Sequence, residues 1–521
     1  MLQTDVEKIK TKTKKQRFSY IPLRYIFAAI LLVVETSIII GTFGLACFYL
    51  PYFFILAIIL QFGCTLKIIS SDYNPDYKVP WLIVIFVLPI IGFMLYLIFY
   101  SRRLKKKYIN RLAFFDKHGY KYSDDKLQEV FLQENEVLQN QAKYLCNTAN
   151  TKVFSNTKQV YFSTGQQMHL SMLEDLKKAE KFIYLEYFII KYGKFWSSIL
   201  NILIEKAKQG VEVKVLFDDI GCMRTLPGNY CSILKKVGIE ALTFSRVKGH
   251  ATSEFNNRNH RKLMIIDGKV CYTGGVNLSD EYINEIVRFG YWKDTGIRLE
   301  GPAVWEFTKM FVTDYGINQK RVHRLRQDLY PQFDDFKENG YIVPFGDGPA
   351  PIYNRGVGKG IIQAMLAHAT KTAYITTPYL IIDNDMCQSI EDAALRGVDV
   401  RIIVPHIPDK KIVFSISRSF YKRLMDAGVK IYEYALGFIH AKTYIIDGQV
   451  AMLGTINLDY RSLVHHFENG VWMYNCSCIK DIKADVDEVI GMSLEVTKDM
   501  IKMSPIKRFL RACIRVFAPL F

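Results

Sequence analysis

Two long apolar runs dominate the first hundred residues. Residues 25–66 carry a single charge, Glu35, and residues 79–100 carry none. About 20 apolar residues are enough for a helix to cross a bilayer. We therefore expect a transmembrane hairpin over 25–66, with its turn near Pro51, and a further transmembrane segment over 79–100. A buried core helix is the alternative for each run. No small-residue cleavage site follows a short apolar core, so a removed signal peptide is not expected.

Basic residues flank both ends of this apolar region. Residues 1–24 form a basic tail, and a second basic cluster follows residue 100, at Arg102, Arg103, Lys105, Lys106 and Lys107. Such clusters favour the cytoplasmic side of a membrane, which requires an even number of crossings. The hydropathy pattern gives three. The number of spans therefore stays open at two or three, with the C-terminal part of the chain expected in the cytoplasm.

After residue 100 the pattern becomes that of a folded α/β protein. Residues 101–152 are polar with apolar positions at helical spacing, which predicts a linker helix. Short apolar strands then alternate with amphipathic helices. Segments of 153–340 recur in the same order in 341–495; AKQGVEVKVLF, for example, matches ALRGVDVRIIV. This internal duplication predicts two α/β lobes packed face to face.

The last segment, residues 496–521, is basic and amphipathic. In SPIKRFLRACIRVFAPLF, Ser504 is the expected N-cap and Pro505 the first helical residue. One face would hold Ile506, Phe509, Leu510, Cys513 and Phe517, flanked by basic residues. This pattern suits an anionic membrane surface, and a helix docked on the core is an equal alternative.

One motif occurs in both halves. NHRKLMIIDGKVCYTGGVNL runs over 259–278, and IHAKTYIIDGQVAMLGTINL over 439–458. Each copy holds His, Lys, Asp and Asn in the same register: His260, Lys262, Asp267 and Asn277, then His440, Lys442, Asp447 and Asn457. The Asp-Gly between two apolar runs predicts a β-hairpin, so both aspartates are turn residues as well as catalytic candidates. His and Lys lie two apart on a strand and therefore share a face.

Two such copies supply what phosphodiester exchange requires. One histidine can attack phosphorus while the other protonates the leaving oxygen. Two lysines and two asparagines can hold the non-bridging oxygens, where negative charge must be stabilised. The chain has no H-E-x-x-H, no C-x-x-C and no cluster of carboxylates at ligand spacing. We therefore expect neither a metal nor another cofactor.

The net charge of +17 favours an anionic partner, either nucleic acid or an acidic lipid surface. Much of this charge flanks the apolar runs, which favours lipid and makes nucleic acid the rival interpretation. We therefore expect a membrane-bound enzyme with no nucleic-acid partner. The sequence does not determine the oligomeric state.

The doubled motif resembles the phospholipase D superfamily and, more narrowly, the bacterial cardiolipin synthases. YWKDTGIRLEGPAV, TPYLI and GTINLDYRS add to the similarity, which covers about residues 79–521. The resemblance implies two lobes on a pseudo-twofold axis with both motifs at their interface. It also implies a cell-membrane phosphatidyltransferase that converts two phosphatidylglycerol molecules into cardiolipin and glycerol through a phosphatidyl-histidine. A hydrolytic phospholipase D, a phosphatidylserine synthase and a scaffold that only binds anionic lipid are the alternatives.

The resemblance also implies roles for individual residues. His260 is expected to be the nucleophile and His440 the general acid and then base. An acidic residue should orient each histidine through its other ring nitrogen. We expect Asp294, in WKDT, to pair with His260, and Glu468, in HHFEN, to pair with His440. HHFEN carries two histidines where the family usually has Leu-Asn.

Overall fold

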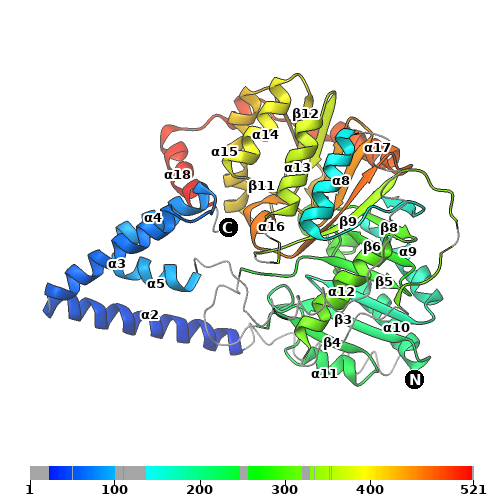
Figure 1. Cartoon of the computed structure of the whole chain (residues 1–521), viewed down its shortest axis with the longest axis horizontal. Coiled ribbons are helices and arrows are strands. Elements are labelled where there is room, and N and C mark those ends of the chain that lie inside the picture. Colours follow the sequence, from blue (N-terminus) through cyan, green and yellow to red (C-terminus); the bar gives the residue numbers. More distant parts are fainter. Residues whose placement is uncertain are drawn as a thin grey trace.

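The computed structural model describes most of the chain outside the N-terminal tail and the linker (Figure 1). The described residues are 23–49, 51–99, 110, 136–246, 256–319, 329–333, 335–350, 352–353 and 355–518. The basic tail predicted over 1–24 lies almost wholly outside this set. So do the second basic cluster and most of the linker predicted over 101–152.

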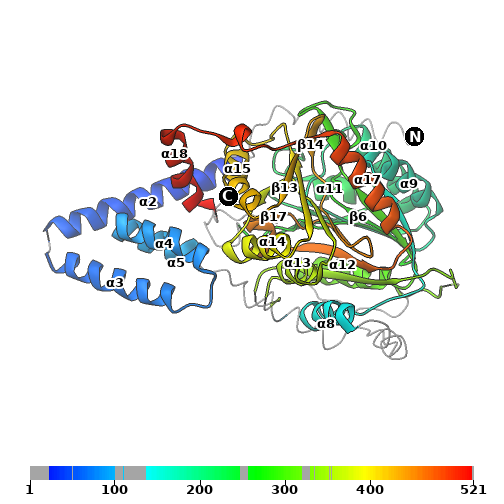
Figure 2. The same ribbon diagram turned by 90° about the horizontal axis from the view of Figure 1, so that it is seen from above.

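Four helices form an arm that projects from the rest of the molecule (Figures 1 and 2). They are α2 (Leu23–Tyr49), α3 (Pro51–Ile69), α4 (Pro75–Val87) and α5 (Pro89–Phe99). The turn between α2 and α3 falls next to Pro51, as the sequence predicts. Proline opens α3, α4 and α5, a position where its missing N–H costs nothing because the first turn of a helix leaves N–H groups unpaired anyway.

The run 79–100, which the sequence predicts as one membrane-spanning segment, is not a single helix in the structure. The run is divided at Leu88 into α4 and α5, of 13 and 11 residues. Pro89 cannot donate to a helix continuing from α4, and the residue before a proline avoids helical geometry; Leu88 accordingly has φ −131° and ψ 74°. Among the described residues, no helix combines the length and hydropathy needed to cross a membrane, in contrast with the spans predicted over 25–66 and 79–100.

The first lobe is built on a seven-stranded sheet in the order β1-β8-β6-β5-β2-β3-β4. Its strands are β1 (Lys158–Phe162), β2 (Phe182–Tyr187), β3 (Glu212–Asp218), β4 (Glu240–Phe244), β5 (Lys262–Ile266), β6 (Val270–Gly274) and β8 (Gly296–Glu300). Its helices are α9 (Gly165–Lys178), α10 (Lys194–Lys208), α11 (Tyr230–Lys235) and α12 (Val304–Asn318), with a 3-10 turn, η2, at Asp280–Ile283.

The second lobe is built on an eight-stranded sheet in the order β19-β13-β12-β10-β15-β16-β18-β9. Its strands are β9 (Tyr341–Asp347), β10 (Thr372–Thr376), β12 (Asp399–Pro405), β13 (Lys430–Tyr434), β15 (Thr443–Ile446), β16 (Val450–Gly454), β18 (Glu468–Tyr474) and β19 (Ser493–Glu495). Its helices are α13 (Val357–His368), α14 (Asn384–Leu395), α15 (Lys411–Asp426), α16 (Tyr460–Val464) and α17 (Ile479–Gly491). A short parallel pair, β11 (Leu380–Ile381) with β17 (Leu458–Asp459), lies outside the main sheet.

The two sheets repeat one topology. Seven strands of each sheet are equivalent in order, starting with β4 in the first sheet and β13 in the second. In this alignment β5 matches β15 and β8 matches β18. The central pairs are parallel in both sheets, β2 with β3 and β10 with β12, and the strands of the motif hairpins run antiparallel. The predicted mixed α/β fold with two sheet-containing lobes is therefore confirmed.

Three apolar cores hold the layers together. One fills the space between the outer face of the first sheet and α9 to α11, and another lies under α13 to α15 on the second sheet. The third lies between the facing sheets and includes side chains from α12 and α17. The described part of the predicted linker, α8 (Glu136–Ala149), packs on the second lobe, where Gln141 accepts a hydrogen bond from Trp472 Nε1 at 3.0 Å.

The C-terminal helix α18 (Pro505–Val516) begins as the sequence predicts, with the Ser504 side chain accepting from the Lys507 N–H. It lies beside α15 and near α4 (Figure 2). Arg515 holds it there, with its guanidinium 4.1 Å from the centre of the Phe420 ring. The apolar face is not docked on the core, because Ile506, Phe509 and Leu510 are all exposed.

Candidate active site between the lobes

Backbone pairing across the lobe boundary places both motif histidines. Strand β14 (Gly437–Ile439), which leads into His440, pairs in parallel with β7 (Tyr291–Lys293) of the first lobe. The His440 N–H donates to the Lys293 carbonyl at 2.7 Å. Equivalently, the His260 N–H donates to the Phe467 carbonyl of the second lobe at 2.8 Å. His440 therefore lies beside the end of β7 in the first lobe, and His260 lies beside the start of β18 in the second lobe.

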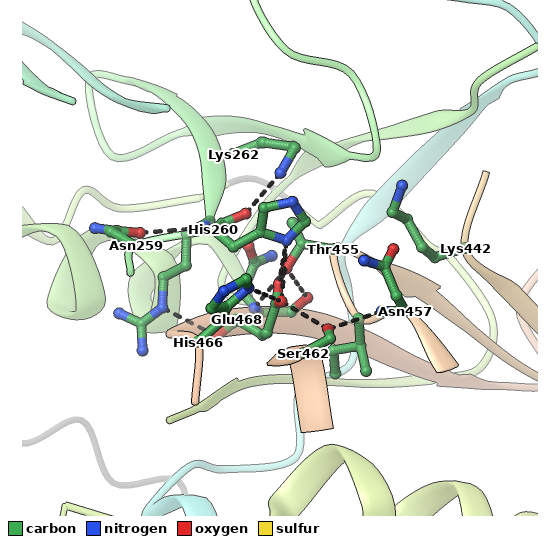
Figure 3. Close-up of polar contacts among 12 residues, drawn as sticks. Asn259, His260, Lys262, Lys442, Thr455, Asn457, Ser462, His466 and Glu468 are labelled. Carbon is green, nitrogen blue, oxygen red and sulfur yellow. Dashed lines mark hydrogen bonds and ion pairs between the residues drawn. The ribbon is translucent and has the colours of Figure 1, made fainter. Parts of the chain in front are cut away.

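This pairing reverses the predicted acid–histidine partners. His260 Nδ1 lies 2.9 Å from both carboxylate oxygens of Glu468 (Figure 3). His440 Nδ1 lies 2.7 Å from Asp294 Oδ2. The expectation that each histidine pairs with the acid of its own half is wrong. Asp294 follows Lys293, whose carbonyl accepts from the His440 N–H, and Glu468 follows Phe467, whose carbonyl accepts from the His260 N–H. Each lobe orients the other lobe's imidazole.

Glu468 is an ionised carboxylate surrounded by hydrogen-bond donors. It is fully buried, and it accepts hydrogen bonds from the hydroxyls of Thr455 and Ser462, the latter at 2.6 Å. Burial by itself raises the pKa of Glu468, but the hydrogen bond from His260 and the adjacent His466 outweigh burial and hold this pKa well below its ordinary value.

Asp294 has fewer donors. Besides contacting His440 Nδ1, this carboxyl group accepts from the Thr295 N–H at 2.9 Å. Gly275 occupies the position that Thr455 holds in the other lobe, and a Cβ at Gly275 would overlap the Asp294 carboxylate. Burial raises the pKa of Asp294 to about 7, against the opposing charge of Lys442. The two acids thus differ in ionisation although their positions are equivalent.

Both histidines are held in the neutral form. Burial lowers the pKa of His260 to about 3, against the opposing charge of Glu468. Burial, together with the charges of Lys442 and Lys262, lowers the pKa of His440 well below its ordinary value. A neutral imidazole carries one hydrogen, and the partner of Nδ1 decides which nitrogen holds it.

The motif lysines lie at the same centre (Figure 3). Lys262 Nζ donates to the His260 carbonyl at 2.7 Å, and Lys442 Nζ donates to the His440 carbonyl and lies 2.8 Å from His440 Nδ1. Within the described residues, neither forms an ion pair with a carboxylate. Burial lowers the pKa of Lys262 to about 7 and that of Lys442 to about 8. Two buried ammonium groups without a carboxylate partner form a site for an anion.

The two asparagines lie beside this centre, and both are partly engaged within the protein. Asn277 donates from Nδ2 to the Tyr282 hydroxyl at 2.8 Å, and Asn457 donates from Nδ2 to Asp459 at 2.9 Å. An amide nitrogen carries two hydrogens, so each asparagine keeps one donor for a ligand.

The structure does not bring Asp267 and Asp447 to the histidines. Each occupies the hairpin turn at the far end of the motif strand, with φ near +55°. The Asp267 carboxylate accepts from the backbone N–H groups of residues 180, 181 and 182 at 2.7–2.8 Å, and Asp447 accepts from those of 370, 371 and 372 at 2.7–2.9 Å. The predicted catalytic role therefore gives way to a structural one, which ties each hairpin to the start of the neighbouring central strand.

Several residues around the histidines escaped the sequence analysis. Aromatic rings flank both imidazoles: Phe188 lies 5.1 Å from the His260 ring, and Tyr282 and Trp292 lie 5.4 and 5.5 Å from the His440 ring, between centroids. The sequence shows Thr455 in GTINL where the first copy has glycine in GGVNL. Its role depends on its hydrogen bond to Glu468, which sequence spacing cannot identify.

Two known families match segments of this chain, and one of them covers both motifs. The family described as "Cardiolipin synthase, PLD-like domain" matches residues 172–287 and 362–490, and the "Phospholipase_D-nuclease N-terminal" family matches residues 55–99. A solved structure of phosphatidylserine synthase from Haemophilus influenzae shares the fold, with a TM-score of 0.56 at 14% identity, covering 74% of this chain and all of that one.

Relatives match most of the chain. An uncharacterized protein of Streptococcus mutans is 41% identical, covering 88% of this chain and 99% of its own length. A cardiolipin synthase of Alkalihalophilus pseudofirmus is 33% identical over 87% of this chain and 90% of its own, and one of Staphylococcus aureus is 34% identical over 80% and 86%. The chain therefore belongs to the cardiolipin synthase family, phosphatidyltransferases built on phospholipase D-like domains.

Proposed function

We propose that this enzyme joins two phosphatidylglycerol molecules into cardiolipin and releases glycerol, with His260 as nucleophile and His440 as general acid and then base. The observation that carries the proposal is the pair of cross-lobe His–acid contacts, one to an ionised carboxylate and one to an acid with a pKa near neutrality.

The two acids favour different tautomers. His260 Nδ1–H donates to the ionised Glu468, which leaves a lone pair on Nε2 for attack. His440 Nδ1 accepts from Lys442 or from protonated Asp294, which places the ring hydrogen on Nε2. A nucleophile needs the first arrangement and a proton donor needs the second, so the assignment follows from the acids.

In the first step, His260 Nε2 forms a bond to phosphorus as the bond to the glycerol oxygen breaks. His440 gives its Nε2 proton to that oxygen, and glycerol leaves. The imidazolium of the phosphatidyl-His260 is stabilised by Glu468. Lys262 and Lys442 stabilise the charge on the non-bridging oxygens, and the incoming anion favours their protonated forms.

In the second step, His440 accepts the proton from a glycerol hydroxyl of the second phosphatidylglycerol. That oxygen attacks phosphorus, the P–N bond breaks, and cardiolipin and free His260 result. Hydrolysis would use water in the same place, so excluding water decides between transferase and phospholipase activity. The aromatic rings around both histidines support a dry site.

Product analysis tests this proposal. The full chain, incubated with phosphatidylglycerol vesicles, should yield cardiolipin and glycerol in equal amounts by mass spectrometry. Phosphatidic acid as the main product would instead make the enzyme a hydrolase. His260→Ala serves as the inactive control. A phosphatidyl group covalently trapped on wild-type His260 after quenching with a denaturing detergent at neutral to mildly alkaline pH would support the intermediate directly, because the P–N bond is labile in acid.

We further propose that the enzyme works on the cell membrane, with its lobes on the cytoplasmic side. Exposed apolar side chains cover α2 to α5, including Val33, Ile38, Phe48, Phe62 and Phe86, and α18 adds Ile506, Phe509 and Leu510. A contiguous apolar surface of this kind favours contact with lipid. Insertion of the arm in a multi-pass arrangement is part of the proposal.

Vesicle flotation tests the contribution of α18. Replacing Ile506, Phe509 and Leu510 together by serine should weaken binding to anionic vesicles and lower turnover on them. Leu395→Ser, at a similarly exposed leucine on the end of α14, is the control and should have no effect. Unchanged binding of the triple variant would remove α18 from the lipid contact.

A further inference from the structure

His466 stands beside the nucleophile without a hydrogen bond of its own. Its Nδ1 lies 3.7 Å from Glu468 Oε1, beyond hydrogen-bond range, and its ring centroid lies 5.5 Å from that of His260 (Figure 3). Both ring nitrogens are buried and have no hydrogen-bond partner among the described residues. Burying two imidazole nitrogens without hydrogen bonds costs free energy, and a ligand bound at these nitrogens would offset that cost.

We propose that His260, His466 and Glu468 form a binding site for Zn²⁺ that inhibits the enzyme. Their ligand atoms all lie within 4.8 Å of one another. Two imidazole nitrogens and one carboxylate oxygen form a donor set that zinc uses with a fourth position left to water or substrate. A tetrahedral zinc with bonds of about 2.05 Å needs its ligand atoms about 3.3 Å apart.

The present distances lie on either side of that requirement. His260 Nδ1 is 2.9 Å from Glu468, and His466 Nδ1 is 3.7 Å from it. His260 Nδ1 and Glu468 must move apart by a few tenths of an ångström, and His466 must move toward both of them. The His466 side chain is 11% exposed and breaks no hydrogen bond when it moves, so the adjustment is small.

Binding exchanges a proton for the metal. Zn²⁺ takes the place of the hydrogen on His260 Nδ1, that proton passes to solvent, and one Glu468 oxygen changes from hydrogen-bond acceptor to ligand. The carboxylate then no longer supports the imidazolium that forms when His260 attacks phosphorus. Inhibition therefore rests on the proposed role of His260, whereas zinc binding itself does not.

The donor set also predicts selectivity. Imidazole nitrogen favours Zn²⁺ and Co²⁺, whereas Mg²⁺ and Ca²⁺ prefer sites made of oxygen. Mg²⁺ in excess should therefore not displace Zn²⁺ from this site.

Metal titration of the full-length protein in detergent tests the site. Co²⁺ should give the visible absorption bands of a four-coordinate nitrogen–oxygen site, and Zn²⁺ should abolish them at one equivalent. His466→Asn, which removes a ligand but keeps the size of the side chain, should weaken Zn²⁺ binding at least about 100-fold, since even residues outside the ligand shell change metal affinity by roughly 10–100-fold. His406→Asn is the matched control, because the His406 side chain pairs with Glu433 at 2.9 Å, away from His466. This variant should bind Zn²⁺ like the wild type.

Activity measurements separate this proposal from the proposed function. Zn²⁺ should inhibit cardiolipin formation by the wild type, with weaker inhibition of His466→Asn, and EDTA should not lower turnover. A His466→Asn variant that binds Zn²⁺ as tightly as the wild type, or a wild type without the Co²⁺ bands, would overturn the zinc site and leave the proposed function intact. Loss of all activity in EDTA would instead overturn the metal-free mechanism.

Discussion

The two lobes share one topology and one motif, yet the polar surroundings of their acids differ. Glu468 accepts from Thr455 and Ser462, whereas Asp294 faces Gly275 and keeps a pKa of about 7. On the proposed mechanism, a twofold scaffold supports an asymmetric reaction, because two hydroxyl groups donate to the acid of one half, whereas no hydroxyl of the described residues donates to Asp294. We infer that the residues around the acids set the proposed roles of the two histidines.

The largest effect should come from removing either histidine. His260→Ala and His440→Ala should each lower turnover of phosphatidylglycerol by about 10²–10⁴-fold, the usual contribution of a proton-transfer group, or more for the nucleophile. A phosphatidyl nitrophenol ester distinguishes them, because nitrophenolate leaves without a proton. His440→Ala should retain a burst of nitrophenol and His260→Ala should not. The reverse result would exchange the two roles.

Replacing a buried lysine should cost activity and gain stability. Lys262→Met should lower kcat by about 10²–10³-fold, comparable to the loss of one donor to a transition-state anion. The pKa of Lys262 falls from 10.5 to about 7 on folding, so the wild type gains stability as pH rises between these values. The variant should therefore have the higher Tm at pH 7, and the gap should close near pH 10. A lower Tm at pH 7 would contradict this account.

Asp294→Asn should change the pH profile. The raised pKa of Asp294 means that its proton is present below about pH 7 and is lost as pH rises through that value. We expect kcat/KM of the wild type to fall over that range, because the supply of protons to His440 is lost. Asparagine cannot ionise, so the fall should become less steep and keep only the part that follows Lys262 and Lys442, whose pKa values are about 7 and 8. The plateau should be roughly tenfold lower for one weakened hydrogen bond. Glu468→Gln should keep the full steepness of the fall, and an equally shallow profile in that variant would remove the difference between the acids.

Asp267→Asn should affect stability alone. It weakens hydrogen bonds to three backbone N–H groups, which should cost about 1–3 kcal/mol of unfolding free energy. The kcat of the folded enzyme should be unchanged, as should that of the equivalent Asp447→Asn. A drop in kcat without a drop in Tm would return these aspartates to the catalytic group.

The smallest effect should follow from Ser462→Ala, which removes one hydroxyl donor from Glu468. About 1 kcal/mol, and so roughly a fivefold loss in kcat/KM, is expected. Ser198→Ala, at a hydroxyl bound to His169 at 2.8 Å on the outer side of the first lobe, is the control. An unchanged rate in Ser462→Ala would show that Thr455 suffices.

Much of this arrangement could be predicted from the sequence, because repeats and short-range patterns record local structure. The duplicated segments predicted two lobes, and the Asp-Gly turns placed both hairpins. The partners of His260 and His440 could not be predicted, since equivalent acids follow both motifs at similar spacing and only backbone pairing across the lobes decides between them. The break at Leu88 could not be predicted from hydropathy, because an average over the run is little changed by one proline. The helix ends there because Pro89 has no backbone N–H to donate.

The apolar layer between the facing sheets has one more consequence. This layer contains side chains from both halves, including those of α12 and α17. Separating the two halves would therefore expose apolar side chains of each half to water. A chain nicked between α12 and β9 should therefore remain one particle and keep its activity, whereas either fragment produced alone would lack half of its own interior as well as the acid for its histidine.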